Sequence, residues 1–354
     1  HISYYLKWPS LNDIFKINSV GIVTGRDKLT IQENRKRMYD TVVNFTCSEN
    51  EFARMVWNLG KDSSDWSIDN AKKDILNTKY YEKYIYPIAY RPFDNRYTFY
   101  TGKPKGFITR SRYDVMKHML KENIGLISVR QVAETSFNHA FVTDALMESR
   151  MTLSNKGIAY LFPLYLYPDE DSFEETRQTN FKPEFLQFLK DLYKIVPEPE
   201  TVMGYIYAIL YSDQYRSKFA DFLRTDFPRI PFIEDYEQFM KLSDKGLDLI
   251  NAHMMKAKDI VNIAKYEGQG DNNIIESIEY LESENCIKIN DQKKFTCITP
   301  QMWYYHIGGY QVLHKYLKDR RTEKMSDPVY FCKIASVINH TIKIQEEIDE
   351  LLDL

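Results

Sequence analysis

The chain has few cysteines, no adjacent prolines and no long apolar run. Its four cysteines in 354 residues form no Cys-x-x-Cys pair, and such sparse use in a large chain fits a reducing cytoplasm. No apolar run approaches the ~20 residues that a membrane span requires, and no signal peptide is visible. We therefore expect a cytoplasmic protein with no membrane partner.

Zinc binding is the one metal site that the sequence leaves open. Cys286 and Cys297 could join His253 or His306 around a zinc ion, but their spacing matches no standard zinc motif. Free cysteines are among the most often buried residues. Buried structural thiols are therefore the favoured interpretation, and we assign no metal site.

The motifs of several enzyme classes are missing or incomplete. A methyltransferase acting on a base amine needs an Asn/Asp-Pro-Pro-aromatic loop, and the sequence has no Pro-Pro at all. It has no P-loop, and Gly268-Gln269-Gly270 lacks the third glycine of a dinucleotide site. Asp291-Gln292-Lys293 has the local form of a nuclease motif, but we expect a solvated turn there. No Ser or Cys can be paired with His118, His139 or His306. We assign no catalytic residue, and whether the chain is an enzyme stays open.

A local excess of positive charge is the most informative feature that is present. Residues 86–131 carry nine Lys or Arg and three acids, whereas the whole chain has a net charge of −3. Eight aromatic residues are interleaved with these charges. A polyanion is the first candidate partner, because each Lys or Arg set against a phosphate releases a condensed counterion. Arg and aromatic side chains can also read bases or stack on them.

Three short pieces of this segment are candidates for binding nucleic acid. Tyr90–Arg96 places two arginines on either side of a turn, although Asp94 could simply hold one of them in a salt bridge. Thr101–Arg112 combines glycines and hydroxyls with four cations, which suits a loop that approaches phosphates. Ser128–Gln131 ends a predicted strand with an Arg-Gln pair that can bind guanine and adenine edges. We expect the cations to converge on one concave surface that holds a double helix. The candidate DNA-binding residues are Arg91, Arg96, Lys103, Lys105, Arg110, Arg112, Arg130 and Gln131.

Apolar periodicity and turn residues predict an α+β fold that begins with a sheet-containing lobe. A strand is expected at Val20–Thr24, followed by helices at Ile31–Phe45, Glu49–Leu59 and Asp65–Asn77. A hairpin of Tyr84–Tyr90 and Arg96–Tyr100 is expected around Pro92–Asn95. A short helix is expected at Val115–Leu120, and further strands at Ile124–Arg130, Ala140–Thr143 and Ile158–Leu166.

An acidic stretch after Pro168 marks a predicted boundary between a first lobe, residues 1–168, and a second, mainly helical lobe, residues 169–354. The acids are Asp169, Glu170, Asp171, Glu174 and Glu175. Helices are expected at Pro183–Tyr193, Thr201–Tyr211, Asp213–Leu223, Tyr236–Leu242 and Lys245–Lys256, and a small hairpin at Cys286–Ile289 with Lys294–Ile298. A long terminal helix begins at Asp327-Pro328, and its ~25 residues give ~38 Å. Such a helix packs along a whole lobe or reaches a neighbouring domain.

A series of motifs is spread in order over nearly the whole chain. They are YRPFDNR (90–96), YTGKPKGFITRSR (100–112), VMKHML (115–120), IGLISVRQ (124–131), YLFPLYLYP (160–168), GYIYAIL (204–210), YRSKF (215–219), DFPRIPF (226–232) and IGGYQVLHKYLKDR (307–320). Together they resemble the C-terminal specificity region of single-polypeptide restriction–modification enzymes, the type ISP group and related adenine methyltransferase–nucleases. In that family an adenine-N6 methyltransferase domain precedes this region, and a nuclease and a helicase-like motor precede the methyltransferase. The start at His1 and the missing Pro-Pro loop fit a cut just after the methyltransferase.

The resemblance implies a DNA target-recognition module without catalysis of its own. It would recognise a short asymmetric sequence in double-stranded DNA and hold the duplex against the methyltransferase domain of the same polypeptide, so that one adenine can flip out. No cofactor is expected in this chain, whereas S-adenosylmethionine, Mg²⁺ and ATP are expected for the other domains. Two alternatives stay open: a protein-docking module that couples motor and methyltransferase, and an independent nuclease.

The family signatures Tyr90–Arg96 and Ile307–Arg320 are expected to be scaffold or to contact phosphates rather than to read bases. In the second signature we expect Gly308-Gly309 to open a helix that buries Tyr310, Leu313 and Leu317. The cations at its end would then lie in solvent. They are Lys318, Arg320 and Arg321.

Overall fold

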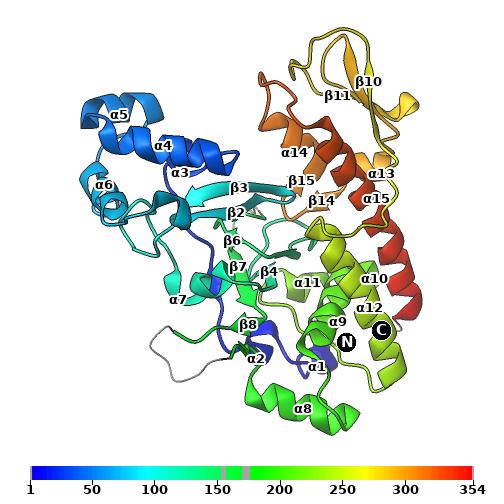
Figure 1. Ribbon diagram of the computed structural model, residues 1–354. Helices are drawn as coiled ribbons and strands as arrows, with labels where there is room; N and C mark the ends of the chain where they lie inside the picture. Colours follow the sequence, from blue (N-terminus) through cyan, green and yellow to red (C-terminus); the bar gives the residue numbers. More distant parts are fainter. Residues whose placement is uncertain (1, 153–156, 170–175, 353–354) are drawn as a thin grey trace.

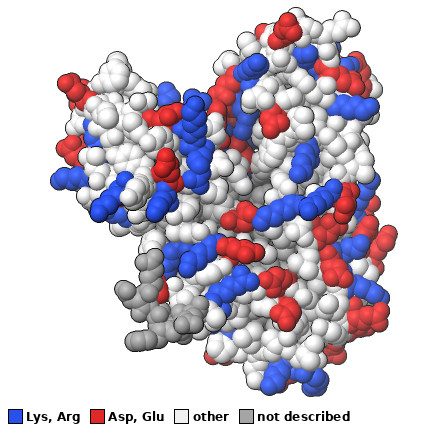
Figure 2. Space-filling model, in the orientation of Figure 1, with Lys and Arg blue, Asp and Glu red and all other residues white. Residues whose placement is uncertain are grey.

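The computed structural model describes residues 2–152, 157–169 and 176–352, and the predicted α+β class is confirmed. Figure 1 shows strands at the centre, a group of helices at the upper left, and a longer helical and β part on the right. Figure 2 shows that the two upper parts are separated by a hollow. The predicted acidic boundary falls largely outside the described residues, which do not include Glu170, Asp171, Glu174 and Glu175. The boundary between the two lobes therefore stays a prediction.

Two small sheets form the centre of the molecule. The first is antiparallel throughout, with the order β1 (Ser19–Val20), β7 (Ala159–Pro163), β4 (Gly125–Val129) and β5 (Phe141–Thr143). The second has the order β3 (Asp94–Phe99), β2 (Ile85–Arg91) and β6 (Leu146–Met147), with β2 and β6 parallel. The predicted hairpin is therefore confirmed as β2–β3. Residues 21–22 join the sheets, because Gly21 donates to Ala159 and Ile22 donates to Met147.

Four helices lie at the upper left of Figure 1, and the second of them, α4, packs on the β2–β3 hairpin. They are α3 (Asp27–Thr30), α4 (Arg35–Cys47), α5 (Asn50–Trp57) and α6 (Ile68–Leu76). In α4 the buried residues Met38, Val42 and Phe45 recur every three or four positions, which is the apolar face that the periodicity predicts. The three helices predicted here are confirmed with shorter bounds, because Asn34 and Ser67 accept from backbone N–H groups and fix where α4 and α6 begin.

Short elements complete this half of the chain. The helix predicted at Val115–Leu120 is divided into α7 (Tyr113–Met116) and the 3-10 turn η2 (Lys117–Leu120). The others are α1 (Ile2–Tyr5), α2 (Leu11–Ile14), the 3-10 turn η1 (Tyr81–Tyr84), and the antiparallel pair β8 (Tyr165–Leu166) and β9 (Gln178–Thr179).

Helices α9 (Pro199–Tyr211) and α12 (Tyr236–His253) pack closely in the second half. A Cβ added to Gly246 would lie 1.7 Å from the carbonyl oxygen of Gly204, so only glycine permits this approach. The sequence predicts two helices where α12 is continuous, and this prediction is wrong. Ser243 does not interrupt the helix, because its buried hydroxyl donates to the Phe239 carbonyl one turn earlier. Around this pair lie α8 (Pro183–Tyr193), α10 (Asp213–Lys218) and α11 (Ala220–Leu223).

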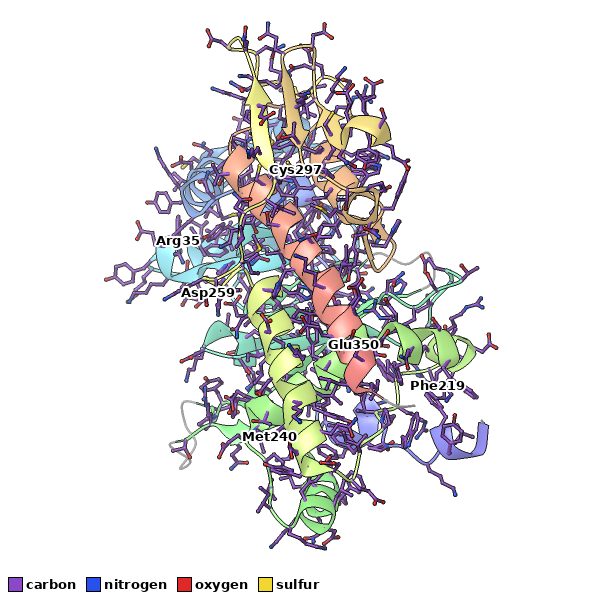
Figure 3. All side chains as sticks on the ribbon, turned by 90° about the vertical axis from the view of Figure 1, so that its right-hand side faces the viewer. Arg35, Phe219, Met240, Asp259, Cys297 and Glu350 are labelled. Atoms are coloured by element: carbon purple, nitrogen blue, oxygen red, sulfur yellow. The ribbon has the colours of Figure 1, made fainter. Side chains whose placement is uncertain are left out.

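The terminal helix α15 (Pro328–Leu351) begins where the sequence predicts, because the Asp327 side chain accepts from the backbone N–H of Tyr330. It lies beside α12, as Figure 3 shows, and therefore packs along the chain's own helices. Phe331, Ile334 and Val337 belong to one hydrophobic core, whereas Ile344 and Ile348 belong to the other. α15 thus joins the two cores.

A four-stranded antiparallel sheet lies near the start of α15. Its order is β10 (Lys265–Gly268), β13 (Lys293–Thr296), β12 (Cys286–Lys288) and β11 (Glu279–Leu281), with the 3-10 turn η3 (Glu282–Glu284) after β11. The sequence predicts only the β12–β13 hairpin. Its two outer strands escape prediction because neither contains a buried residue, so they carry no apolar alternation.

The Gly308-Gly309 pair lies between β14 (His306–Ile307) and β15 (Tyr310–Gln311), not at the start of a helix. Gly308 has φ +59°, and a Cβ there would lie 1.9 Å from the Thr152 carbonyl oxygen. The prediction that these glycines open a helix is therefore wrong. The helix, α14 (Val312–Lys318), begins after β15, and α13 (Pro300–Trp303) precedes the hairpin.

The residues considered for zinc do not come together. His253 is buried, with the Tyr207 hydroxyl 2.6 Å from Nδ1 and the Thr341 hydroxyl 2.9 Å from Nε2. Burial lowers the pKa of His253 to about 3, so the ring is neutral. Cys286 is buried as expected, whereas Cys297 is exposed, against the prediction. Within residues 2–152, 157–169 and 176–352, no group of three or more His, Cys, Asp or Glu could hold a metal ion.

Within the same residues, no helix is long and apolar enough to span a bilayer.

Candidate nucleic-acid interface

The candidate cations lie in three separate places, not on one concave surface. Arg91 and Arg96 lie at the end of the β2–β3 hairpin that faces α14, the loop of residues 101–112 lines a groove beside α6, and Arg130 and Gln131 line another groove beyond β4. Figure 2 shows basic and acidic side chains interspersed over much of the face in view.

The hairpin arginines are engaged by acids. Arg91 Nη1 lies 2.8 Å from Glu148 Oε2, and Arg96 Nη2 lies 2.9 Å from Asp94 Oδ2. The expectation that Asp94 braces one of these arginines is confirmed. Asp94 also binds Arg320 at 2.7 Å, so the prediction that Arg320 lies free in solvent is wrong. The reason is the turn of the hairpin, which brings Asp94 against the end of α14.

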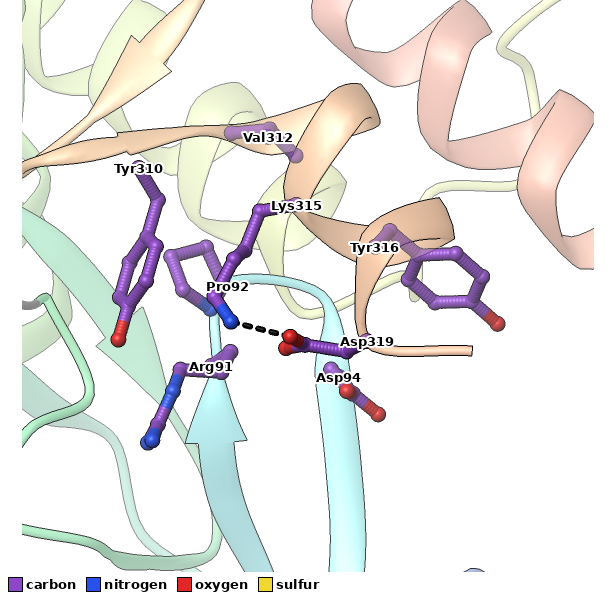
Figure 4. Close-up of a pocket in the computed structure, with 8 residues that line it drawn as sticks. All are labelled: Arg91, Pro92, Asp94, Tyr310, Val312, Lys315, Tyr316 and Asp319. Atoms are coloured by element: carbon purple, nitrogen blue, oxygen red, sulfur yellow. Dashed lines mark hydrogen bonds and ion pairs between the residues drawn. The ribbon is translucent and has the colours of Figure 1, made fainter. Parts of the chain in front are cut away.

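The space beside these residues is structural rather than a ligand site. Figure 4 shows Arg91 and Pro92 beside Tyr310 and Lys315, with Lys315 paired to Asp319 directly after the end of α14. The cavity measures about 10 Å³, which is room for no more than one water. Arg91 and Arg96 therefore hold this junction together.

The loop of residues 101–112 is held on α6 by the buried carboxylate of Asp74. Asp74 Oδ1 accepts from the Thr101 hydroxyl at 2.8 Å, and Oδ2 accepts from the Phe107 backbone N–H at 2.9 Å. Trp66 Nε1 donates to the Phe107 carbonyl at 3.2 Å. The loop is thus presented in one conformation, which suits a recognition surface.

This loop lines a groove of about 620 Å³ that contains Lys105, Arg110 and Arg112. Asp65 lies on the opposite side and competes for two of these cations, at 3.2 Å from Arg110 and 3.9 Å from Lys105. Arg112 is half-buried, and its Nε has no hydrogen-bond partner among the described residues. Lys103 is exposed beside the groove. Arg112 forms no ion pair among the described residues, so no acid competes with an external anion for its charge.

A second groove, of about 660 Å³, adjoins the first at Tyr113, which lines both. Five tyrosines and three lysines line it: Tyr84, Tyr86, Tyr100, Tyr113, Tyr167, Lys83, Lys117 and Lys121. Tyr113 packs against Gly102, where a Cβ would lie 2.3 Å from the ring. Aromatic rings beside cations are the surface on which unpaired bases stack.

Arg130 and Gln131 line a smaller groove of about 240 Å³ with Tyr160 and Ile158. Arg130 Nε lies 3.1 Å from Asp226, and both side chains are exposed, so this pair is weak and can open for a base edge. The roles of all eight candidate residues in DNA binding stay predictions.

A further cationic surface lies outside the sequence motifs. Arg35, Lys36 and Arg37 are exposed at the beginning of α4, directly after the capping residue Asn34. Three consecutive cations after a helix cap are a visible signal. It is overlooked because the charge of residues 86–131 is stronger.

Comparison with known proteins places these observations in a family. Residues 13–354 match the model of the Type ISP C-terminal specificity domain. No curated protein matches the chain. Among solved structures, the ATP-dependent Type ISP restriction-modification enzyme LlaBIII bound to DNA is similar, with a TM-score of 0.74, 17% identity, and coverage of 99% of this chain and 24% of that chain.

Two further solved structures have the same fold. A nuclease-deletion mutant of the Type ISP restriction-modification enzyme LlaGI, in complex with a DNA substrate mimic, has a TM-score of 0.69 and 17% identity, covering 99% of this chain and 34% of that one. The DrdV–DNA complex has a TM-score of 0.70 and 19% identity, covering 94% of this chain and 36% of that one. The chain thus spans about a quarter to a third of these proteins. The family match extends over nearly every residue, so this chain belongs to the Type ISP C-terminal specificity domain family.

Proposed function

We propose that this chain is the DNA target-recognition module of a restriction–modification enzyme. The observation that carries the proposal is the match of residues 13–354 to the specificity-domain family. The solved relatives are described as bound to DNA or to a DNA mimic, which supports the same class of partner here. The protein would read a short sequence in double-stranded DNA.

The loop of residues 101–112 is the part of the candidate interface that suits this role best. Its backbone is fixed by Asp74 and Trp66, and its cations line an open groove. Contacts of Arg and Lys with phosphates position a duplex but carry no sequence information. Arg130 and Gln131 are the candidates for reading base edges.

The remaining steps of the reaction belong to the parent polypeptide. This module would position the duplex so that a methyltransferase domain can methylate one adenine and a nuclease can cleave. S-adenosylmethionine, Mg²⁺ and ATP would be bound by those other domains. The chain spans about a quarter to a third of its solved relatives, which leaves room for such domains in a protein of their size.

The experiment is a measurement of duplex binding by the 354-residue chain over a series of salt concentrations, followed by selection of preferred sites from a random-sequence pool. Affinity should fall with salt along a log–log slope of about −0.9 per phosphate contact. The selected pool should converge on one short motif. A slope near zero, or a pool without any preference, would contradict the proposal.

Docking on the methyltransferase domain of the same polypeptide is a second candidate function. One observation favours it: Phe52, Met55 and Val56 are exposed on one face of α5. Apolar side chains at this helical spacing suit an interface. Co-purification with the remainder of the parent enzyme should be lost in Phe52→Ser/Met55→Ser but retained in Ile195→Ser/Val196→Ser, which changes two exposed apolar residues elsewhere.

A further inference from the structure

The hollow between the two upper parts of the molecule is bordered by basic side chains on its left and by basic and acidic side chains on its right (Figure 2). We call it the basic hollow. Wall one is residues 26–37, from α3 to the beginning of α4, and wall two is residues 315–324, from α14 into the link to α15. Each wall contains five Lys or Arg and only two acids, in a chain whose net charge is −3. Neither wall belongs to the basic segment of residues 86–131.

At least five of these ten cations are exposed and form no ion pair among the described residues. On wall one, Lys28 and Lys36 are exposed, and among the described residues neither forms an ion pair. On wall two the same holds for Lys318, Arg321 and Lys324. This contrasts with the loop of residues 101–112, where Asp65 competes for two cations. The basic hollow therefore keeps more uncompensated positive charge than the groove.

The floor of the basic hollow is also positive, and it is rigid. Arg96 and Arg320 share the single carboxylate of Asp94, which leaves one excess positive charge. The Arg96 guanidinium lies 4.7 Å from the Tyr90 ring, and that of Arg320 lies 3.7 Å from the Tyr316 ring. Because these groups are already fixed, a partner loses little affinity to ordering them.

The width of the floor limits what can enter. Gln32 of wall one exchanges two backbone hydrogen bonds with Tyr97, and Arg320 of wall two binds Asp94. Tyr97 and Asp94 are three residues apart on β3, which is ~10 Å of strand. The major groove of B-DNA alone is ~12 Å wide. The two walls are therefore anchored closer together than the width of a major groove, which suits one phosphate backbone between them better than a whole duplex.

We propose that the basic hollow grips the sugar–phosphate backbone of one strand of double-stranded DNA, apart from the groove of residues 101–112. This inference rests on the proposed function. A small anion would engage few of the cations, whereas a nucleic-acid strand carries a charge every ~3.4 Å and matches both walls at once. Contacts of this kind are independent of sequence, so the hollow would set the position of the duplex while other residues read bases.

The test compares two triple variants of the 354-residue chain that lose the same charge. The hollow variant is Lys36→Ala/Lys318→Ala/Arg321→Ala, and the control is Lys7→Ala/Lys190→Ala/Lys194→Ala at exposed positions near α2 and on or beside α8. Binding of a labelled duplex is measured over a salt series. The hollow variant should bind roughly tenfold more weakly for every sequence, with a log–log salt slope lower by up to about 2.7. The control should change by less than about twofold.

The outcomes separate this inference from the proposed function. If the wild type binds the duplex tightly and the hollow variant binds it as tightly as the control does, the inference about the hollow is wrong, whereas the proposed function stands. Absence of DNA binding by the wild type would overturn both. A polyglutamate peptide that competes as well as DNA of equal charge would assign the hollow to an acidic protein segment and would also overturn the inference. Thermal denaturation checks folding, and Lys36→Glu and Lys318→Glu singly replace the triple variant if it does not fold.

Discussion

The carboxylate of Asp94 binds the guanidinium of Arg320, 226 residues later in the chain, at 2.7 Å. The same carboxylate binds Arg96 on its own hairpin, and the Tyr330 hydroxyl donates to the neighbouring Phe93 carbonyl at 2.9 Å. The contact therefore joins the motif YRPFDNR to the end of IGGYQVLHKYLKDR. Both motifs thereby acquire a structural role, namely to fix the β2–β3 hairpin against α14 and α15.

Loss of the Asp94 charge should be strongly destabilising. Asp94→Asn keeps the shape of the side chain but leaves two guanidiniums without their counter-charge, and the expected loss in the free energy of unfolding is about 3–5 kcal/mol. Arg320→Ala should cost less, about 1–3 kcal/mol, because Arg96 still pairs with Asp94. Urea unfolding measures both. Arg321→Ala, at the exposed neighbouring position, is the control and should stay within about 0.5 kcal/mol. Equal effects of Asp94→Asn and Arg321→Ala would refute this role.

The contribution of Asp94 should depend on pH. Burial alone would raise the pKa of Asp94, but the charges of Arg96 and Arg320 outweigh burial and hold the pKa below its ordinary value. The unfolded chain therefore binds this proton more tightly than the folded protein, so the stabilisation is complete above the unfolded pKa of about 4 and is lost as the pH falls through the lowered pKa. The difference in unfolding free energy between wild type and Asp94→Asn should be constant from about pH 5 to 8 and shrink below about pH 4. The difference in unfolding free energy between wild type and Arg321→Ala should not change with pH in this way, because the substitution removes no group that titrates in this range.

The sequence predicts those elements whose local signals agree with their surroundings. α15 is an example, because the Asp327 cap, Pro328 and the apolar periodicity all indicate the same helix. α12 is the opposite case: the sequence predicts a break at Ser243, and only the contact of Gly246 with Gly204 on α9 explains why glycine is present in this helix. A contact between two distant helices has no local signature.

The same limit explains what could be anticipated of the candidate interface. The charge of residues 86–131 is visible in the sequence, but three of the acids that engage it come from outside this segment: Asp65, Glu148 and Asp226. Charge counted along the chain therefore overestimates the charge available to a partner. The basic hollow shows the reverse, because its walls are two modest clusters almost 300 residues apart in sequence that β3 brings together.

Removal of the Asp65 charge should strengthen DNA binding. Asp65 lies 3.2 Å from Arg110 and 3.9 Å from Lys105, so Asp65→Asn releases two cations of the loop of residues 101–112 for phosphates. Affinity for duplexes of any sequence should rise about threefold to tenfold, with a steeper salt dependence. Asp191→Asn, at an exposed position on α8, removes the same charge elsewhere and is the control. Affinity that is unchanged, or equal in the two variants, would show that these loop cations do not contact the backbone.

Arg130 should determine specificity rather than affinity for DNA in general. Among the described residues its guanidinium is held by the exposed pair with Asp226, and it can exchange this acid for a guanine edge. In Arg130→Ala, discrimination at one position of the preferred site should fall by about 1–3 kcal/mol, while the other positions keep their preference. Site selection from a random pool, carried out in parallel for wild type and variant, measures this. Arg112→Ala provides the contrast, since loss of a phosphate contact should weaken binding to all sequences alike. Uniform weakening in Arg130→Ala as well would reassign Arg130 to the backbone, and an unchanged pool and affinity would remove it from the interface.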